Sequence, residues 1–154
     1  MKKKKILIVC TGNTCRSPLA MVIISDHLKK NAPTSNFSVL SAGVSAQNGE
    51  PASKHAAQVA SELGLSLDKH AARRVDRNLL KGVDLILCMT GTHKLHLLHN
   101  FENLEGKCFT FAECVISQDI SDPYGRDIEA YREIAAAIKN SMPDLLSFLK
   151  KFFP

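Results

Sequence analysis

The chain has 154 residues, 45% of them hydrophobic and 23% charged, and a formal net charge of +5. This length and composition are typical of one soluble globular domain with a sizeable core, so we expect a single domain over residues 1–154. Four positive charges form the run 2–5, which is too short to indicate nucleic-acid binding. The apolar stretch behind that run is too short for a signal peptide, and no stretch is long enough for a membrane helix.

Strands and helices alternate along the chain. Apolar runs and turn signals predict strands over 4–9, 37–41, 83–89 and 107–111. Helical spacing and capping signals predict a short helical turn at 76–81 and longer helices over 18–30, 52–63, 93–100 and 128–149. Ser17 is expected to be the N-cap of the first helix, and Pro143 is expected to kink or split the last. The alternation predicts an α/β fold with helices on both faces of a parallel sheet.

The segment 10–18, which reads CTGNTCRSP, joins the first predicted strand to the first predicted helix. A loop that opens a helix exposes backbone N–H groups, and the helix dipole adds partial positive charge at the same point. This field favours a bound anion and favours the thiolate form of Cys10. Arg16 has a planar group that binds two phosphate oxygens at once. The segment therefore predicts a cysteine nucleophile beside a phosphate-binding loop.

Three segments resemble the low-molecular-weight protein tyrosine phosphatase family: 9–18, Ser41-Ala42-Gly43, and Asp122-Pro123-Tyr124-Gly125. The resemblance spans nearly the whole chain. It implies a three-layer domain with a four-stranded parallel sheet in the order 2-1-3-4. Thr14 resembles the bacterial protein arginine phosphatase branch, since members specific for phosphotyrosine more often have isoleucine there. The resemblance thus implies a phosphoprotein phosphatase that favours phosphoarginine, with phosphotyrosine as the alternative substrate.

Four residues are expected to carry the catalysis. Cys10 attacks phosphorus to form a phosphocysteine intermediate, and Arg16 stabilises the charge of the transition state. Asp122 is expected to protonate the leaving group and then to act as base for the attacking water. Ser17 is expected to stabilise the thiolate when the phosphocysteine is hydrolysed.

Further residues are expected to bind phosphate or to support the site. The phosphate-binding loop comprises Thr11, Gly12, Asn13, Thr14 and Cys15. Gly12 and Asn13 tolerate left-handed backbone angles, which would turn successive N–H groups inward. The resemblance implies a pocket wall at Tyr124 and support for the loop from Ser41 and His70. The acid that usually partners this histidine in the family is replaced here by Thr90.

The other cysteines leave alternatives open. Cys15 could form a reversible disulfide with Cys10, or it could be a small buried hydrophobe. Thioredoxin-coupled arsenate reductases share the loop, but they need two further cysteines on a mobile segment. The corresponding region offers only Cys88, inside a predicted strand, and Cys108 and Cys114 are expected to be structural. A non-catalytic anion-binding module would lack one of the catalytic residues, whereas all are present.

We expect neither a metal nor a cofactor. Three histidines recur at i, i+3 and i+6, but no cysteine or carboxylate completes a metal site, and a solvated helix face is expected at His93, His96 and His99. The odd number of cysteines and the need for a reduced Cys10 favour the cytoplasm. We expect a monomer that acts on phosphorylated proteins and binds neither nucleic acid nor membrane. The apolar tail 145–153 is expected either to cover the sheet or to contact a partner.

Overall fold

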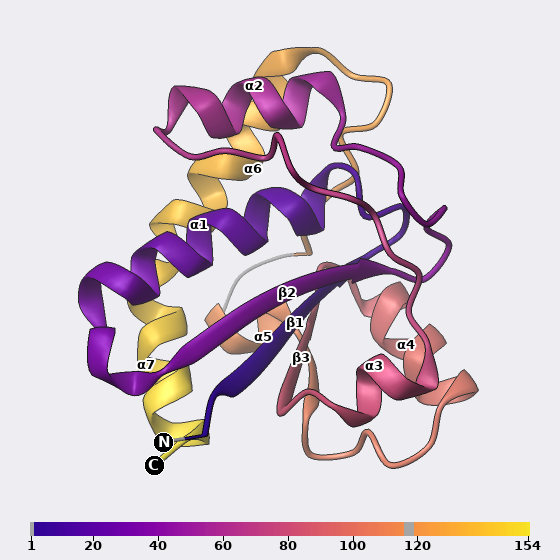
Figure 1. The fold of residues 1–154 in the computed structure, drawn as a ribbon, viewed down its shortest axis with the longest axis vertical. Helices are drawn as coiled ribbons and strands as arrows, with labels where there is room; N and C mark the ends of the chain where they lie inside the picture. Colours follow the sequence, from indigo (N-terminus) through magenta and orange to yellow (C-terminus); the bar gives the residue numbers. More distant parts are fainter. Residues whose placement is uncertain (1, 116–118) are drawn as a thin grey trace.

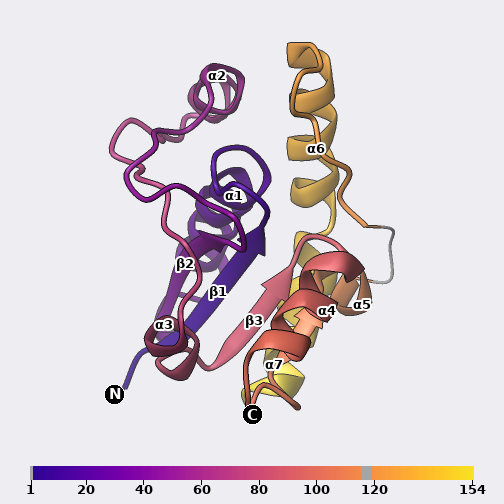
Figure 2. The ribbon, with the colours of Figure 1, turned by 90° about the vertical axis from the view of Figure 1, so that its right-hand side faces the viewer.

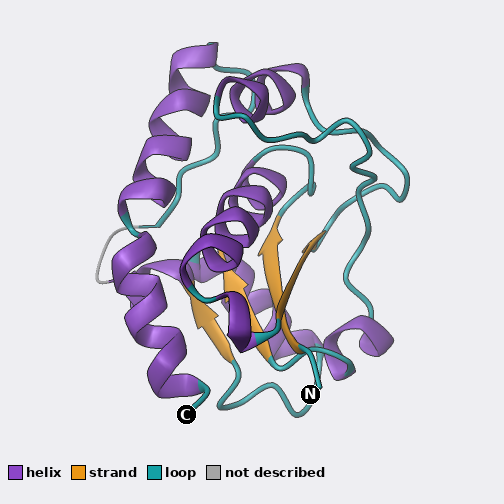
Figure 3. Ribbon diagram, turned by 60° about the vertical axis from the view of Figure 1, so that its left-hand side comes forward, coloured by secondary structure: helices purple, strands orange, loops and turns teal. Residues whose placement is uncertain are grey.

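The computed structural model describes residues 2–115 and 119–154. Its centre is a parallel sheet in the order β2-β1-β3-β4, made of β1 (Lys4–Cys10), β2 (Phe37–Gly43), β3 (Leu85–Cys88) and β4 (Cys108–Thr110). All strand arrows point to the same end of the molecule (Figure 3). The four predicted strands and their order are confirmed, with boundaries that differ by one or two residues.

Seven α-helices and one 3₁₀ helix accompany the sheet in the described ranges. The helices are α1 (Arg16–Asn31), α2 (Lys54–Glu62), α3 (Arg77–Lys81), α4 (Gly91–Asn100), α5 (Phe111–Val115), α6 (Ile128–Asn140) and α7 (Met142–Phe152), with η1 at Pro33–Ser35. The sequence did not predict η1 or α5. Pro143 splits the last predicted helix, because it lies in the first turn of α7, where its missing N–H costs no hydrogen bond. Within the described ranges, each helix is too short or too polar to cross a membrane.

The strand β1 is buried on both sides. Ile6 and Ile8 pack into a core with α1, α2, α5, α6 and α7, while Leu7 and Val9 pack into a second core with α3 and α4. Figure 1 shows α1 on one side of the strands and α3 and α4 on the other. Each of these side chains contributes roughly 1.5–3 kcal/mol through burial. The continuous apolar run predicted this arrangement, because a central parallel strand has no solvent-facing side.

The apolar tail covers the sheet. Leu145 and Leu149 are buried, and the Phe109 ring on β4 meets the rings of Phe148 and Phe152 at centroid distances of 5.4 and 5.9 Å. The hydrophobic face of α7 is therefore covered by other residues of the same chain. Of the two alternatives for the tail, the structure shows the intramolecular one.

Candidate active site

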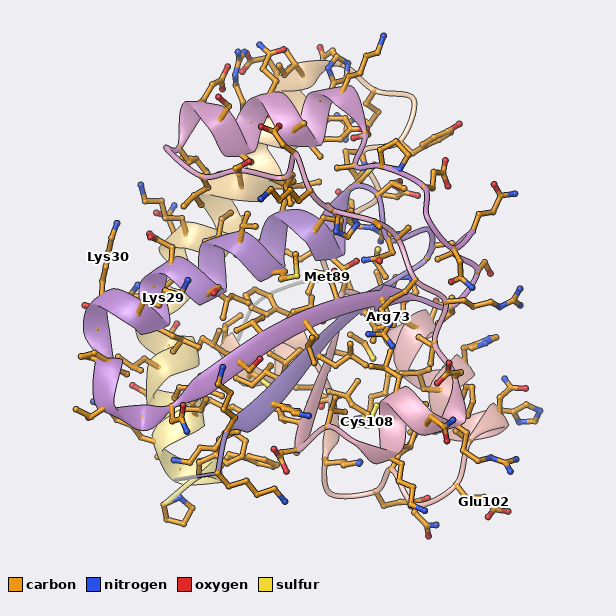
Figure 4. All side chains as sticks on the ribbon, in the orientation of Figure 1. Lys29, Lys30, Arg73, Met89, Glu102 and Cys108 are labelled. Carbon is orange, nitrogen blue, oxygen red and sulfur yellow. The ribbon has the colours of Figure 1, made fainter. Side chains whose placement is uncertain are left out.

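The segment 10–16 lies at the carboxyl end of the sheet, where α/β proteins of this kind bind ligands. Cys10 is the last residue of β1, Arg16 is the first residue of α1, and Figure 2 shows the loop between them. Lys29 and Lys30 lie at the other end of α1 (Figure 4). A pocket of about 270 Å³ opens at the loop and is lined by Cys10, Thr11, Gly12, Thr14, Cys15, Arg16, Glu50, Asp122 and Tyr124.

The Cys10 sulfur lies at the base of this pocket and is almost fully buried. Its Sγ lies 2.9 Å from the Ser17 hydroxyl oxygen, and the Asn13 N–H donates to it over 3.3 Å. Both groups can donate a hydrogen bond to a negative sulfur, and the N-terminus of α1 adds partial positive charge beside it. Two potential donors and the N-terminus of α1 therefore converge on the Cys10 sulfur.

Ser17 does not cap the first helix, so that prediction is wrong. The helix begins at Arg16, two residues before its predicted start, after Cys15 at the N-cap, and the cap makes no side-chain hydrogen bond. Ser17 is fully buried, and besides Cys10 its hydroxyl contacts the Asn13 amide and the Ala42 carbonyl oxygen. Its hydroxyl therefore makes its contacts within the site and none with the N–H groups at the helix end.

The loop exposes donors for an anion. The backbone N–H groups of Gly12 and of 14–17 donate to no acceptor in the part of the chain that the structure describes. The first-turn N–H groups of a helix have no acceptor within the helix, which is why helix N-termini bind phosphate. The loop therefore presents several N–H groups together with the α1 dipole to one small volume.

Asn13 holds the loop in shape through all its polar groups. Its side-chain amide donates to the Oγ atoms of Ser17 and Ser41 over 2.8 and 2.9 Å, and its Oδ1 accepts from the Arg73 N–H at 3.0 Å. Its backbone carbonyl oxygen lies 2.7 Å from His70 Nε2. Asn13 is fully buried and adopts the left-handed conformation, with φ 58°. Such a satisfied buried network fixes one loop geometry.

The structure brings Ser41 and His70 to the loop, but Gly12 does not adopt the left-handed conformation. Among loop residues 11–15, only Asn13 has a positive φ. The turn therefore depends on one left-handed residue, whereas the sequence predicted two. His70 contacts the loop directly through the Asn13 carbonyl oxygen. Thr90, which replaces that acid, instead caps α4.

Arg16 is held by three groups around the pocket. Its Nη1 donates to the Ile120 carbonyl oxygen at 3.1 Å, and its Nη2 donates to Thr11 Oγ1 at 3.2 Å. The same Nη2 lies 3.6 Å from Oδ2 of Asp122. The guanidinium is nearly buried, so a phosphate bound in the pocket would meet a positive charge that water screens poorly.

Asp122 and Tyr124 lie across the pocket from the loop. The Ile120 N–H donates to the carbonyl oxygen of buried Met89, which ties this segment to the end of β3. The Asp122 side chain is 52% exposed, and its Oδ1 accepts from the Tyr124 N–H at 3.0 Å. Tyr124 is 77% exposed, so it lies at the pocket mouth. This placement lets Asp122 reach both a leaving group and water.

His93 is one site residue that sequence reasoning missed, and Glu50, which lines the pocket, is another. His96 and His99 are exposed as predicted, but His93 is buried, and its Nε2 lies 2.8 Å from Thr11 Oγ1. Burial lowers the pKa of His93 to about 4, and the Arg16 charge acts in the same direction. The available signal was its position: the third residue after Thr90 is where a capping box places its second side chain.

The five cysteines are free and buried. The Cys15 thiol lies 3.4 Å from the Tyr131 hydroxyl and 3.5 Å from Ser53 Oγ, between α2 and α6. Cys88 is fully buried in β3, with its sulfur 4.0 Å from that of Cys108. A relay that passes a disulfide to thioredoxin needs an accessible thiol, so this placement of Cys88 does not favour the arsenate reductase alternative.

Gly43 permits the close approach of the loop to β2, and its replacement by alanine is expected to disrupt the site. An alanine Cβ would lie 2.4 Å from the Thr11 carbonyl oxygen and 2.9 Å from the Asn13 N atom, both in the backbone. Because backbone cannot rotate away, Gly43→Ala is expected to destabilise the fold by about 1–3 kcal/mol and to lower activity by displacing the loop. Urea unfolding and phosphate titration measure the two effects. Gly49→Ala, which meets no neighbouring atom but has φ +91°, is the control for strain alone.

The low pKa of His93 predicts a loss of stability in acid. Unfolded histidine binds a proton near pH 6.5 while folded His93 stays neutral to about pH 4, so protons favour unfolding between these values. Arg16 and His96 lower the pKa, whereas Asp119 and Asp122 raise it. The free energy of unfolding is therefore expected to fall from pH 7 to pH 4 by up to about 3 kcal/mol more in the wild type than in His93→Gln. If urea unfolding shows the same decrease in the free energy of unfolding for the wild type and His93→Gln, the prediction is contradicted.

A buried thiol in a loop of free N–H groups, with a guanidinium beside it and a carboxylate opposite, is the arrangement expected of a cysteine-dependent phosphatase. Comparison with known proteins agrees with this class. The family model described as low molecular weight phosphotyrosine protein phosphatase matches residues 5–152. The chain belongs to this family, whose members are hydrolases of phosphate ester or phosphoramide bonds.

Relatives of both substrate types align along nearly the whole chain. The probable low molecular weight protein-tyrosine-phosphatase EpsP of Ralstonia solanacearum is 33% identical over 139 residues, covering 90% of this chain and 91% of the relative. The protein-arginine-phosphatase of Bacillus subtilis is 33% identical over 148 residues, covering 95% of this chain and 97% of the relative. A solved structure of a YwlE arginine phosphatase mutant with a phosphorylated active-site serine has a TM-score of 0.88 at 32% identity and covers 96% of each chain.

Proposed function

We propose that this phosphatase hydrolyses phosphorylated proteins through Cys10 and favours phosphoarginine over phosphotyrosine. The observation that carries the mechanism is the position of the Cys10 sulfur, 2.9 Å from Ser17 Oγ and 3.3 Å from the Asn13 N atom, in the loop that leads to Arg16. One pocket thus holds a nucleophile, donors for the phosphate oxygens and a carboxylate.

The first step transfers the phosphoryl group to sulfur. A lone pair of the Cys10 thiolate attacks phosphorus, and the bond from phosphorus to the leaving nitrogen or oxygen breaks. Protonated Asp122 gives its proton to that leaving atom. Arg16 and the loop N–H groups bind the phosphate oxygens and stabilise the charge spread over them.

The second step returns the free enzyme. Asp122, now a carboxylate, takes a proton from water as the water oxygen attacks phosphorus, and the P–S bond breaks. The electrons of that bond return to the Cys10 sulfur, and the Ser17 hydroxyl can stabilise the resulting thiolate. Inorganic phosphate leaves, and Asp122 holds the proton for the next cycle.

Pocket chemistry supports phosphoarginine as the preferred substrate. Thr14 lines the pocket with a small polar side chain, and Glu50 and Asp122 bring two polar carboxyl groups to the same lining. A phosphorylated guanidinium is polar and cationic, which suits such a lining better than a phenyl ring does. Among the described residues that line the pocket, Tyr124 is the one aromatic side chain, and it is mostly exposed. The relatives named above do not decide the substrate, since both are 33% identical to this chain.

The direct test is phosphate release from phosphoarginine and phosphotyrosine peptides of matched sequence, with Cys10→Ser as the blank. A higher kcat/KM for phosphoarginine supports the proposal. A higher kcat/KM for phosphotyrosine makes the protein a tyrosine-specific member of the same family. The monomeric state and the cytoplasmic location stay predictions.

Thr14→Ile is expected to shift the preference towards phosphotyrosine. Isoleucine removes the hydroxyl and adds apolar bulk, so the ratio of the two kcat/KM values should move by about tenfold, as pocket substitutions of this size do. Thr14→Val keeps the branched shape without the hydroxyl, and so separates polarity from bulk. An unchanged ratio in both variants would remove Thr14 as the specificity residue.

A further inference from the structure

The tautomer of His93 is set by the N-terminus of α4. The Thr90 N–H donates to His93 Nδ1 over 3.2 Å, and the Thr90 hydroxyl oxygen lies 3.0 Å from the same nitrogen. A nitrogen that accepts a hydrogen bond carries no proton, so the proton of the neutral ring is on Nε2. His93 therefore presents an N–H donor at the atom that faces the active-site loop.

That donor meets the Thr11 hydroxyl, which also accepts a hydrogen bond from Arg16. His93 Nε2 lies 2.8 Å from Thr11 Oγ1, and Arg16 Nη2 donates to the same oxygen at 3.2 Å. A hydroxyl oxygen accepts two hydrogen bonds and donates one. With both acceptor positions taken, the Thr11 hydrogen has to point elsewhere, and Thr11 lines the pocket.

We propose that His93 is a positioning residue of this phosphatase: its Nε2–H fixes the Thr11 hydroxyl as a donor to the bound phosphoryl group and steadies Arg16 through the same oxygen. The inference rests on the proposed function and extends it to a residue outside the loop. No described residue accepts the Thr11 hydrogen, which leaves it for a ligand. His93 itself is buried behind Thr11 and does not line the pocket.

The neutral ring is essential to this arrangement. A protonated His93 would lose the acceptor that receives the Thr90 N–H, and it would place a second positive charge beside Arg16. Its burial and the nearby Arg16 charge both oppose protonation. The donor on Nε2 is thus maintained across the neutral pH range.

The test compares variants of the full chain that remove or retain the hydrogen-bonding groups of residue 93. His93→Leu removes both ring nitrogens, whereas His93→Gln keeps one acceptor and one donor. His96→Leu, on the exposed side of the same helix, is the matched control. Turnover of whichever phosphopeptide the wild type hydrolyses gives kcat and KM. Calorimetric titration with inorganic phosphate gives the affinity of the anion site, and nitrogen NMR of the imidazole reports the tautomer.

We expect His93→Leu to lower kcat/KM by about tenfold or more, mostly through kcat, since the hydrogen bonds it positions strengthen in the transition state. His93→Gln should recover most of this loss, and His96→Leu should show none. Thr11→Val combined with His93→Leu should be no slower than Thr11→Val alone, because both act through one hydroxyl. Nitrogen NMR should show the Nε2–H form at pH 7.

Three results would overturn the inference. The first is a His93→Leu variant that equals His96→Leu in turnover and phosphate affinity. The others are a Thr11→Val/His93→Leu double variant in which the two losses multiply, and an NMR spectrum that places the His93 proton on Nδ1. Failure of the proposed function is seen separately, as a wild type that releases no phosphate from any peptide. Phosphate titration would still decide on His93 in that case: weaker binding in His93→Leu supports the positioning role, and unchanged binding rejects it.

Discussion

Replacing Cys10 by serine is expected to reduce phosphate release by more than about 10⁴-fold, because an un-ionised serine hydroxyl is a far weaker nucleophile than a thiolate. Phosphate affinity should change little, since the loop N–H groups and Arg16 remain. Turnover of phosphopeptides and calorimetric phosphate titration measure the two quantities. Rapid acid quench of the wild type should trap one phosphate on Cys10.

Cys15→Ser is the matched control for the nucleophile. It removes the other thiol of the same loop, whose sulfur contacts Ser53 and Tyr131 between α2 and α6. We expect it to retain turnover and to trap phosphate on Cys10. Activity that survives in Cys10→Ser, or phosphate trapped on Cys15, would show that the wrong sulfur has been assigned.

Asp122→Asn is expected to slow the first step, and the loss should grow with the basicity of the leaving group. An amide has almost the same shape but cannot donate that proton, so basic leaving groups should lose about 10²–10⁴-fold in kcat. An activated aryl phosphate, whose leaving group departs as a stable anion, should lose far less in the first step. The measurement is kcat across aryl phosphates of increasing leaving-group pKa.

Glu50→Gln is the control for charge, because Glu50 is the other carboxylate that lines the pocket. It removes one negative charge, as Asp122→Asn does, but we expect no dependence of its effect on leaving-group pKa. A flat dependence in Asp122→Asn, or a steep one in Glu50→Gln, would mean that Asp122 is not the acid.

The sheet and its order followed from local pattern and resemblance. The strands are runs of apolar side chains such as 6–9, and a strand buried on both faces has to be continuously apolar. The helix ends were less predictable: α1 starts two residues before its predicted start, and α6 and α7 meet at Ser141. Helix ends depend on which groups satisfy the terminal N–H and C=O groups, and this involves distant parts of the chain.

Three interpretations of single residues changed in the structure. The Ser17 hydroxyl contacts the Cys10 sulfur and does not cap α1. Gly12 does not adopt the left-handed conformation, and His93 is buried against Thr11. Each had been interpreted from its neighbours in sequence. In the folded protein, some of the contacts that matter join residues far apart in the sequence, up to 82 positions for Thr11 and His93.

The sequence alone predicted the fold class and the part of the site that runs from Cys10 to Arg16, because both were inferred from residues that are close together in the chain. The order of Cys10, the loop and Arg16 is local, and so is the apolar period that makes each strand and helix. Tertiary structure decided which atoms meet: Asn13 with Ser41 and His70, Arg16 with Asp122, and His93 with Thr11. These contacts need side chains placed to within about 0.5 Å, and that precision comes from the packing of the sheet against its helices.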